Sequence, residues 1–225
     1  EGYRDGLAAA ARRAKEHGFR AGKMEVCVNG PYSHNGLNES NDAIVEIVAA
    51  CRDAVGPDFV MMADVAYCWS SPEEALEVLE RLAPYHLYFL ETPIDIDDLD
   101  GYAFLAEHSP VPIAAGEWQN THWEFRDLAD RGKLAVLQPD VGRVGGFTEI
   151  RKVAEIADHR DLQIVPHCWK SGIGIAASAH FAAATKCCRY IEFVPADLCE
   201  SVLRKELVAD ELEMVDGVIP LPKAP

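Results

Sequence analysis

Short apolar runs alternate with amphipathic segments along nearly the whole chain. Residues 5–17 carry apolar and charged positions at helical spacing and predict a helix, and the apolar stretch 19–28 predicts a strand. Later helices are expected over 42–55, from Ser71 onward, and near 98–107, 122–131, 148–159, 173–184 and 197–206. Later strands are expected over 59–64, 87–91, 112–117, 134–140, 162–167 and 190–193.

The expected strands are apolar on both faces, which is typical of a parallel sheet covered by helices. A chain that repeats strand and helix in this way predicts an α/β fold, and specifically a TIM-type (β/α) barrel. A complete eight-unit barrel takes about 250 residues, whereas this chain has 225 residues and opens on a helix. We therefore expect a partial barrel over 1–207 that lacks its first strand, followed by an irregular tail over 208–225.

Five functional-looking side chains stand at the ends of successive apolar runs. They are separated by 27, 26, 23 and 27 residues, which is the length of one strand, one helix and two loops: Asp64, Glu91, Glu117, Asp140 and His167. In a barrel all strands end on one face, where the active site is built. The spacing therefore predicts that these side chains belong to one site.

The five side chains suggest a metal site and an acid–base pair. Three carboxylates, Asp64, Glu91 and Glu117, would repel one another unless a cation lay between them, and all-oxygen ligands suit Mg²⁺. Asp140 and His167 follow one βα unit apart, so the carboxylate could orient the imidazole as a base. Lys23, inside an apolar strand, is a further candidate as a base or as an electrostatic partner of substrate and metal.

The amino-acid composition restricts the kinds of molecule that the protein is expected to bind. The chain has 37 acidic against 21 basic residues and a formal net charge of −16, which disfavours nucleic acid and anionic membranes. Solvated helix faces account for most of this excess. No stretch has the roughly 18 apolar residues of a membrane span. The seven cysteines show no zinc or redox spacing, so reduced thiols in a cytoplasmic protein are expected.

Taken together, these residues resemble the enolase superfamily, and within it the mandelate racemase-like group. The resemblance is carried by Phe19-Arg20-Ala21-Gly22-Lys23, Asp64, Glu91-Thr92-Pro93, Gly116-Glu117, the run from Gln138 to Gly146, Pro166-His167 and Ile191-Glu192. It implies Mg²⁺ bound by Asp64, Glu91 and Glu117, with His167 as general base or acid paired to Asp140. It further implies that Glu192 contacts the carboxylate of a small-molecule substrate, and that the protein forms a homo-oligomer.

Members of this group remove a proton next to a carboxylate and stabilise the enediolate on the metal. They also have an N-terminal capping domain, which we expect this chain to lack. The leading hypothesis is a Mg²⁺-dependent dehydratase of a sugar acid, an aldonate or aldarate, that gives a 2-keto-3-deoxy acid. In this hypothesis His167 takes the α-proton and protonates the departing β-hydroxyl.

Several positions depart from the racemase pattern or bear on specificity. The second lysine of Lys-x-Lys is replaced by Glu25, which makes two-base racemisation doubtful, and Ala66 replaces a polar residue common in the group. The loop 29–40 offers Tyr32 and His34 as contacts for a sugar hydroxyl. We interpret the glycine-rich run after Asp140 as a tight βα turn, with Arg143 facing the substrate.

The alternatives are a racemase or epimerase, with Glu25 or another group as second base, and a catalytically silent barrel that binds a carboxylate. The muconate-cycloisomerase and dipeptide-epimerase branches are less favoured, because they have a lysine where this chain has Asp140.

Overall fold

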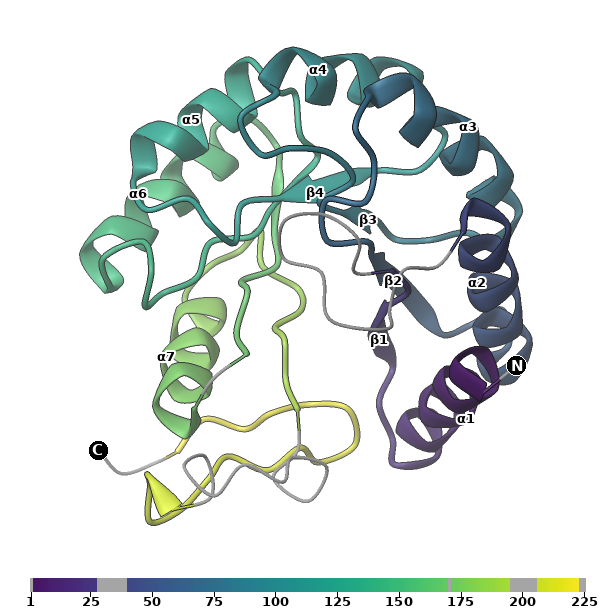
Figure 1. Ribbon diagram of the computed structural model, residues 1–225. Coiled ribbons are helices and arrows are strands. Elements are labelled where there is room, and N and C mark those ends of the chain that lie inside the picture. Colours follow the sequence, from purple (N-terminus) through teal and green to yellow (C-terminus); the bar gives the residue numbers. More distant parts are fainter. Residues whose placement is uncertain (1, 28–39, 170, 195–205, 223–225) are drawn as a thin grey trace. The chain divides into compact units, whose positions relative to one another are not determined.

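The computed structural model describes residues 2–27, 40–169, 171–194 and 206–222. These residues form two compact units, the first over 1–115 with 131–135 and the second over 116–130 with 136–225. Each unit is built from alternating helices and short parallel strands (Figure 1).

The first unit carries four consecutive parallel strands. Its elements in chain order are α1 (Gly2–Glu16), β1 (Ala21–Glu25), α2 (Asn41–Val55), β2 (Val60–Asp64), α3 (Pro72–Leu82), the 3₁₀ turn η1 (Ala83–Tyr85), β3 (Leu90–Glu91), α4 (Leu99–His108) and β4 (Ile113–Ala115). The register aligns Glu25 with Asp64, and Asp64 with Glu91, at the carboxyl ends of β1, β2 and β3. Each of these strands therefore presents its last residue at the same edge of the sheet.

Local sequence explains where these helices begin and which face they bury. The Ser71 hydroxyl accepts a hydrogen bond from the Glu74 amide and Pro72 occupies the first turn of α3, so this helix starts as the sequence predicts. Ser40 caps α2 in the same way, and Gly56, with φ +75°, ends it. The buried positions of α2 recur at helical spacing and form one apolar face: Ile44, Ile47, Val48, Cys51 and Val55.

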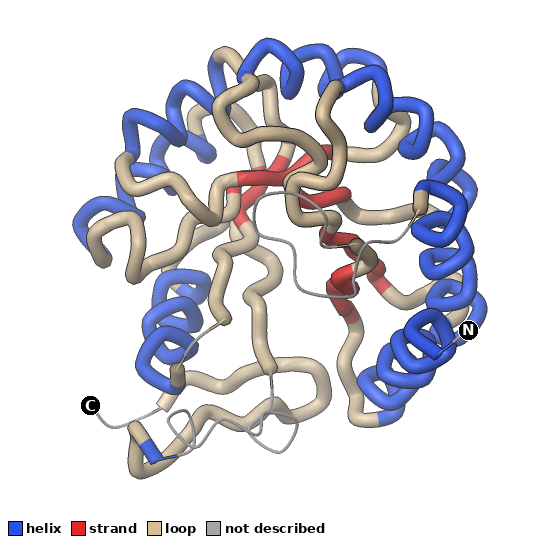
Figure 2. Tube along the Cα trace, in the orientation of Figure 1, coloured by secondary structure: helices blue, strands red, loops and turns tan. Residues whose placement is uncertain are grey.

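The second unit repeats the pattern with α5 (His122–Asp130), β5 (Val136–Leu137), α6 (Phe147–Asp158), β6 (Gln163–Ile164) and α7 (Gly172–Ala183). Strands β5 and β6 are parallel and in register over both residues. Beyond α7 the described part of the tail, 206–222, is mostly loop (Figure 2). It contains a single antiparallel bridge between Val215 and Val218.

One predicted strand is wrong. Residues 190–193 form no strand; the nearest pairing is a single parallel bridge between Ile164 and Cys188. Strand β6 is only two residues long and its bridge falls before Tyr190, so no ladder reaches the predicted segment. The predicted helix over 197–206 lies almost wholly outside the described residues.

Among the described residues, none of the helices combines the length and hydrophobicity that crossing a bilayer requires.

Arg52 joins α2 to the loops before β2 and β3, and we expect its loss to destabilise the protein. Its guanidinium donates hydrogen bonds to the carbonyl oxygens of four residues at 2.8–3.2 Å: Tyr85, Gly56, Phe59 and His86. Replacing Arg52 with Met should lower the free energy of unfolding by about 2–4 kcal/mol, because hydrogen bonds from a charged donor are strong and the carbonyls lose their partner. Urea unfolding measures this loss.

The control is Arg81→Met, which removes an exposed ion pair with Asp42 and should cost under about 1 kcal/mol. Equal losses for the two variants would contradict the role of Arg52.

Candidate active site

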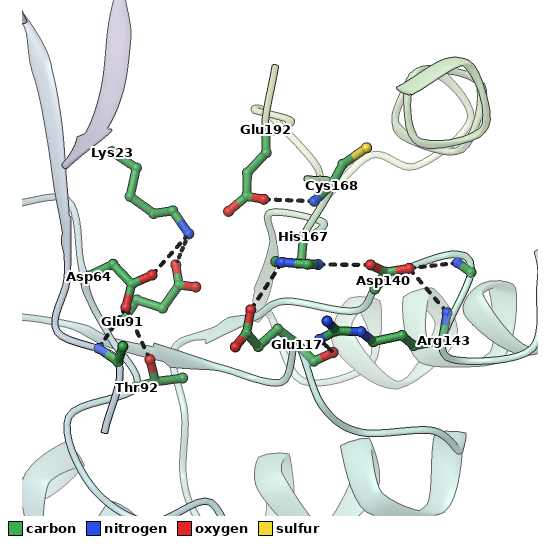
Figure 3. Close-up of polar contacts among 12 residues, drawn as sticks. Lys23, Asp64, Glu91, Thr92, Glu117, Asp140, Arg143, His167, Cys168 and Glu192 are labelled. Atoms are coloured by element: carbon green, nitrogen blue, oxygen red, sulfur yellow. Dashed lines mark hydrogen bonds and ion pairs between the residues drawn. The ribbon is translucent and has the colours of Figure 1, made fainter. Parts of the chain in front are cut away.

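The first unit brings together three of the residues predicted from the sequence. The ammonium Nζ of Lys23, on β1, lies 2.6 Å from Glu91 Oε2 and 3.6 Å from Asp64 Oδ2 (Figure 3). The Glu91 side chain is fully buried, and those of Lys23 and Asp64 are mostly buried. Two carboxylates from neighbouring strand ends thus converge on one positive charge, which offsets the cost of burying them.

Asp64 is held by contacts that leave one of its oxygens directed toward this charge. The amide of Ala66 donates to Asp64 Oδ1 at 2.9 Å, and the hydroxyl of Thr92 donates to the same oxygen at 3.2 Å. Oδ2 is the oxygen nearer Lys23. Thr92 was not expected from the sequence to contribute to the site; its only signal is its place between Glu91 and Pro93.

These carboxylates fit a divalent cation. Within the described residues no group of three or more His, Cys, Asp or Glu side chains is placed so that it could hold a metal ion as it stands. However, the Lys23 ammonium is itself a cation, and the oxygens of Asp64 and Glu91 already gather around it. Carboxylate oxygen is the ligand type that Mg²⁺ prefers.

The second unit brings together Glu117, Asp140 and His167. His167 Nδ1 lies 2.8 Å from Asp140 Oδ2, and Nε2 lies 3.0 Å from Glu117 Oε2 (Figure 3). The imidazole is 6% exposed. Both ring nitrogens therefore face carboxylates, and the predicted pairing of His167 with Asp140 is confirmed.

The loop after β5 fixes Asp140. Its Oδ1 accepts hydrogen bonds from the amides of Gly142 at 2.7 Å and Arg143 at 3.1 Å, while Oδ2 faces the imidazole. The glycine-rich run is thus a tight turn closed on its own carboxylate, as predicted. Burial tends to raise the pKa of Asp140, but the hydrogen bonds from His167, Arg143 and Gly142 outweigh it and lower the pKa below its usual value.

The two carboxylates also control the charge of His167. Burial alone would lower the pKa of the imidazole, but its hydrogen bonds with Asp140 and Glu117, together with the charge of Glu192, raise the pKa to about 9. The imidazolium is therefore the favoured form near neutral pH.

Glu117 is held by its neighbours. Gly116, with φ +132°, precedes it, and a Cβ there would lie 2.6 Å from Phe125, so only glycine fits this turn. The guanidinium of Arg143 donates to the Glu117 carbonyl at 2.8 Å and lies 4.0 Å from the centroid of the Trp118 ring. Arg143 thus fastens the Glu117–Trp118 backbone, a role that the sequence did not indicate.

The remaining predicted residues are placed as follows. The Glu192 carboxylate accepts a hydrogen bond from the Cys168 amide at 2.7 Å. Glu25 is exposed at the end of β1, and its carbonyl accepts a hydrogen bond from the Tyr3 hydroxyl. Tyr32 and His34 lie outside the described residues. Contacts of any of these with a substrate stay predictions.

The chain is similar in sequence to one family of known proteins. A family model described as "Enolase C-terminal domain-like" matches residues 6–225. A D-galactarolactone cycloisomerase of Agrobacterium fabrum is 31% identical over 221 residues, which cover 96% of this chain and 55% of that protein. A D-galactonate dehydratase of Klebsiella pneumoniae is 37% identical over 166 residues, which cover 72% of this chain and 42% of that protein.

Among solved structures, a racemase from Streptomyces coelicolor A3(2) with bound magnesium has a TM-score of 0.81 and 28% identity, and the match covers 97% of this chain and 54% of that one. The family match and this likeness confirm the predicted α/β fold of the barrel type. The chain spans about half the length of the curated relatives it matches.

The raised pKa of His167 predicts that stability falls at alkaline pH. A group whose pKa is 6.5 when unfolded and about 9 when folded contributes stability below pH 6.5, and this contribution is lost as pH rises through 9. In EDTA, the free energy of unfolding in urea should therefore fall between pH 6.5 and pH 9.5. His167→Gln should flatten this dependence, whereas the exposed His159→Gln should keep it. A wild-type stability that is equal at both pH values would show the pKa assignment to be wrong.

Proposed function

Since the chain belongs to the enolase C-terminal domain-like family, within the enolase superfamily, we propose that it serves a Mg²⁺-dependent sugar-acid dehydratase. The substrate class is an aldonate or aldarate, and the product is a 2-keto-3-deoxy acid. The observation that carries the proposal is the buried His167–Asp140 pair at 2.8 Å. The relative named D-galactonate dehydratase supports the reaction class.

His167 performs the proton transfers. Asp140 accepts the hydrogen bond of Nδ1–H, which leaves Nε2 as the nitrogen that exchanges a proton with the substrate. This step needs the neutral imidazole. Glu117 favours a proton on Nε2 while its carboxylate faces the ring, and a Glu117 engaged as the third cation ligand would no longer do so. Neutral Nε2 then takes the proton from the carbon next to the substrate carboxylate, and the C–H electron pair forms a C=C bond. The same proton then goes to the β-hydroxyl, which leaves as water, and the resulting enol rearranges to the 2-keto acid.

Asp64 and Glu91 would hold the cation, and we propose Glu117 as the third ligand. When bound, Mg²⁺ supplies fixed positive charge for the negative charge that develops on the substrate carboxylate. The support for this ligand set is the convergence of Asp64 and Glu91 on one ammonium group, together with the racemase of this fold with bound magnesium.

Other charged side chains would bind the substrate. Lys23, next to Glu91 and Asp64, offers a positive charge for the substrate carboxylate. Glu192, fixed by the Cys168 amide, would contact the substrate carboxylate, which requires a proton on one of the two carboxyl groups. Arg143, Glu25, Tyr32 and His34 remain candidates for specificity, and a homo-oligomer in the cytoplasm remains the expected context.

A second candidate is cycloisomerisation of a sugar-acid lactone, favoured by the relative that matches 96% of the chain. It needs the same proton abstraction, but the group that leaves is a ring oxygen. A racemase or epimerase has weaker support, because Glu25 replaces the second lysine that two-base racemisation would use. A silent carboxylate-binding barrel would need no such proton transfer.

Replacing His167 with Asn should abolish turnover. The protein with Mg²⁺ is assayed against four- to six-carbon aldonic and aldaric acids, with detection of 2-keto-3-deoxy products. We expect at least one substrate for the wild type and a loss of about 10³-fold or more in His167→Asn, since general acid–base catalysis typically contributes 10²–10⁴-fold.

His159→Asn, on an exposed position, is the control and should keep wild-type turnover. Exchange of the α-proton with heavy water without product would favour epimerisation. Full turnover in His167→Asn would remove this residue from the mechanism.

Replacing Glu91 with Gln should weaken Mg²⁺ binding, because it removes one of the two carboxylate charges that converge at the strand ends. We expect the Kd from calorimetric titration to rise at least about tenfold. Glu80→Gln, on the exposed face of α3, is the matched control. A Kd unchanged by Glu91→Gln, in a variant with wild-type circular dichroism, would contradict the ligand assignment.

A further inference from the structure

We propose that Thr92 is a positioning residue that orients Asp64 for cation binding, and that the strained backbone at Thr92 serves to place its hydroxyl against Asp64. The inference rests on the proposed function, because it concerns the cation that Asp64 and Glu91 would hold. It assigns a role to a residue that contributes no charge to the site.

The backbone of Thr92 is in a conformation that disfavours threonine. Its φ is +44°, in the left-handed region, where a β-branched side chain is a steric outlier. The following residue is Pro93, which further restricts the residue before it to extended conformations. Strain of this kind persists only where the surroundings fix the chain, and it concentrates at functional sites.

The surroundings of Thr92 do fix it. The residue is 1% exposed. Its amide donates to the Ala114 carbonyl at 2.9 Å, and its own carbonyl accepts a hydrogen bond from the Tyr67 amide at 2.6 Å. Tyr67 itself has φ +64°, so two left-handed residues meet in this contact beside the ends of β2 and β3.

The left-handed backbone at Thr92 places its hydroxyl next to the Asp64 carboxylate. Oγ1 lies 3.2 Å from Asp64 Oδ1, which also accepts the Ala66 amide at 2.9 Å (Figure 3). Two donors on Oδ1 fix the rotation of the carboxylate and leave Oδ2 toward the Lys23 ammonium, 3.6 Å away. Groups that orient a metal ligand in this way raise metal affinity because the ligand needs no reordering on binding.

A purely structural explanation makes a different prediction. If the turn needed only a left-handed residue, glycine would serve better, since it adopts positive φ without strain. Threonine supplies the hydroxyl instead, in spite of the strain. The unfavourable φ of Thr92 therefore coincides with a contact to Asp64, the proposed ligand. Conformations that oppose a residue's own propensity are expected at functional sites.

The test measures Mn²⁺ binding to the apo protein by electron paramagnetic resonance, together with the melting temperature in EDTA. Thr92→Val keeps the shape but removes the hydroxyl, Thr92→Gly removes both hydroxyl and strain, and Thr92→Ser keeps the hydroxyl. We expect the Mn²⁺ Kd to rise about tenfold in the Val and Gly variants and to stay within about threefold in Ser, which keeps the donor.

The melting temperature separates positioning from stability. Thr92→Gly should melt within about 3 °C of the wild type or above it, because relief of strain offsets the lost hydrogen bond, and yet bind Mn²⁺ as weakly as Thr92→Val. Thr185→Val, which removes a hydroxyl bonded to the Phe181 carbonyl in the second unit, is the matched control and should leave the Kd unchanged.

The outcomes separate this inference from the proposed function. Wild-type Mn²⁺ affinity in Thr92→Val and Thr92→Gly would overturn the role of Thr92 and leave the metal site standing. Absence of Mn²⁺ binding by the wild-type protein would overturn both. Weakened binding only in variants that also melt at lower temperature would assign Thr92 to structure and not to positioning.

Discussion

The burial of the Glu91 carboxylate is the constraint on which the rest of the first unit depends. A fully buried negative charge is tolerated only if an opposite charge and hydrogen-bond donors compensate its lost hydration. The parallel register of β1, β2 and β3 supplies that compensation, since it aligns their ends and brings the Lys23 ammonium within 2.6 Å. Asp64, on the strand between, shares the same charge.

The second unit also buries charged groups, and there an imidazole lies between the carboxylates. His167 is buried between Asp140 and Glu117, and the amides of a tight turn hold Asp140 in turn. The contacts from turn amide to carboxylate to imidazole fix the orientation of the ring and favour its protonated form. The conformation of the turn after Asp140 therefore determines how the His167 ring is oriented for the proposed proton transfers.

The positions of the helices were predictable because their signals are local. The cap at Ser71 and the spacing of buried residues in α2 set these helices to within a residue or two. The strands are shorter than the apolar runs that predicted them; β5, for example, spans Val136–Leu137, whereas the prediction was 134–140. The predicted strand at 190–193 failed because apolar character alone does not supply a pairing partner.

The charged residues of the site were predictable, but the residues that orient them were not. The interval of about 26 residues identified the carboxylates and His167, because one βα unit returns the chain to the same edge. Thr92 and the bond from Arg143 to the Glu117 carbonyl depend on backbone conformations that no residue pattern encodes. A threonine with positive φ is contrary to its own propensity, so only the folded structure reveals it.

We propose that Asp64 and Glu91 gather around a divalent cation. A crystal structure of the protein with Mg²⁺ tests it most directly. We expect Mg²⁺ at about 2.0–2.1 Å from oxygens of both carboxylates, with the Lys23 ammonium displaced from its 2.6 Å contact with Glu91. Lys23 still bridging the two carboxylates at saturating Mg²⁺, with no cation bound to either, would contradict it.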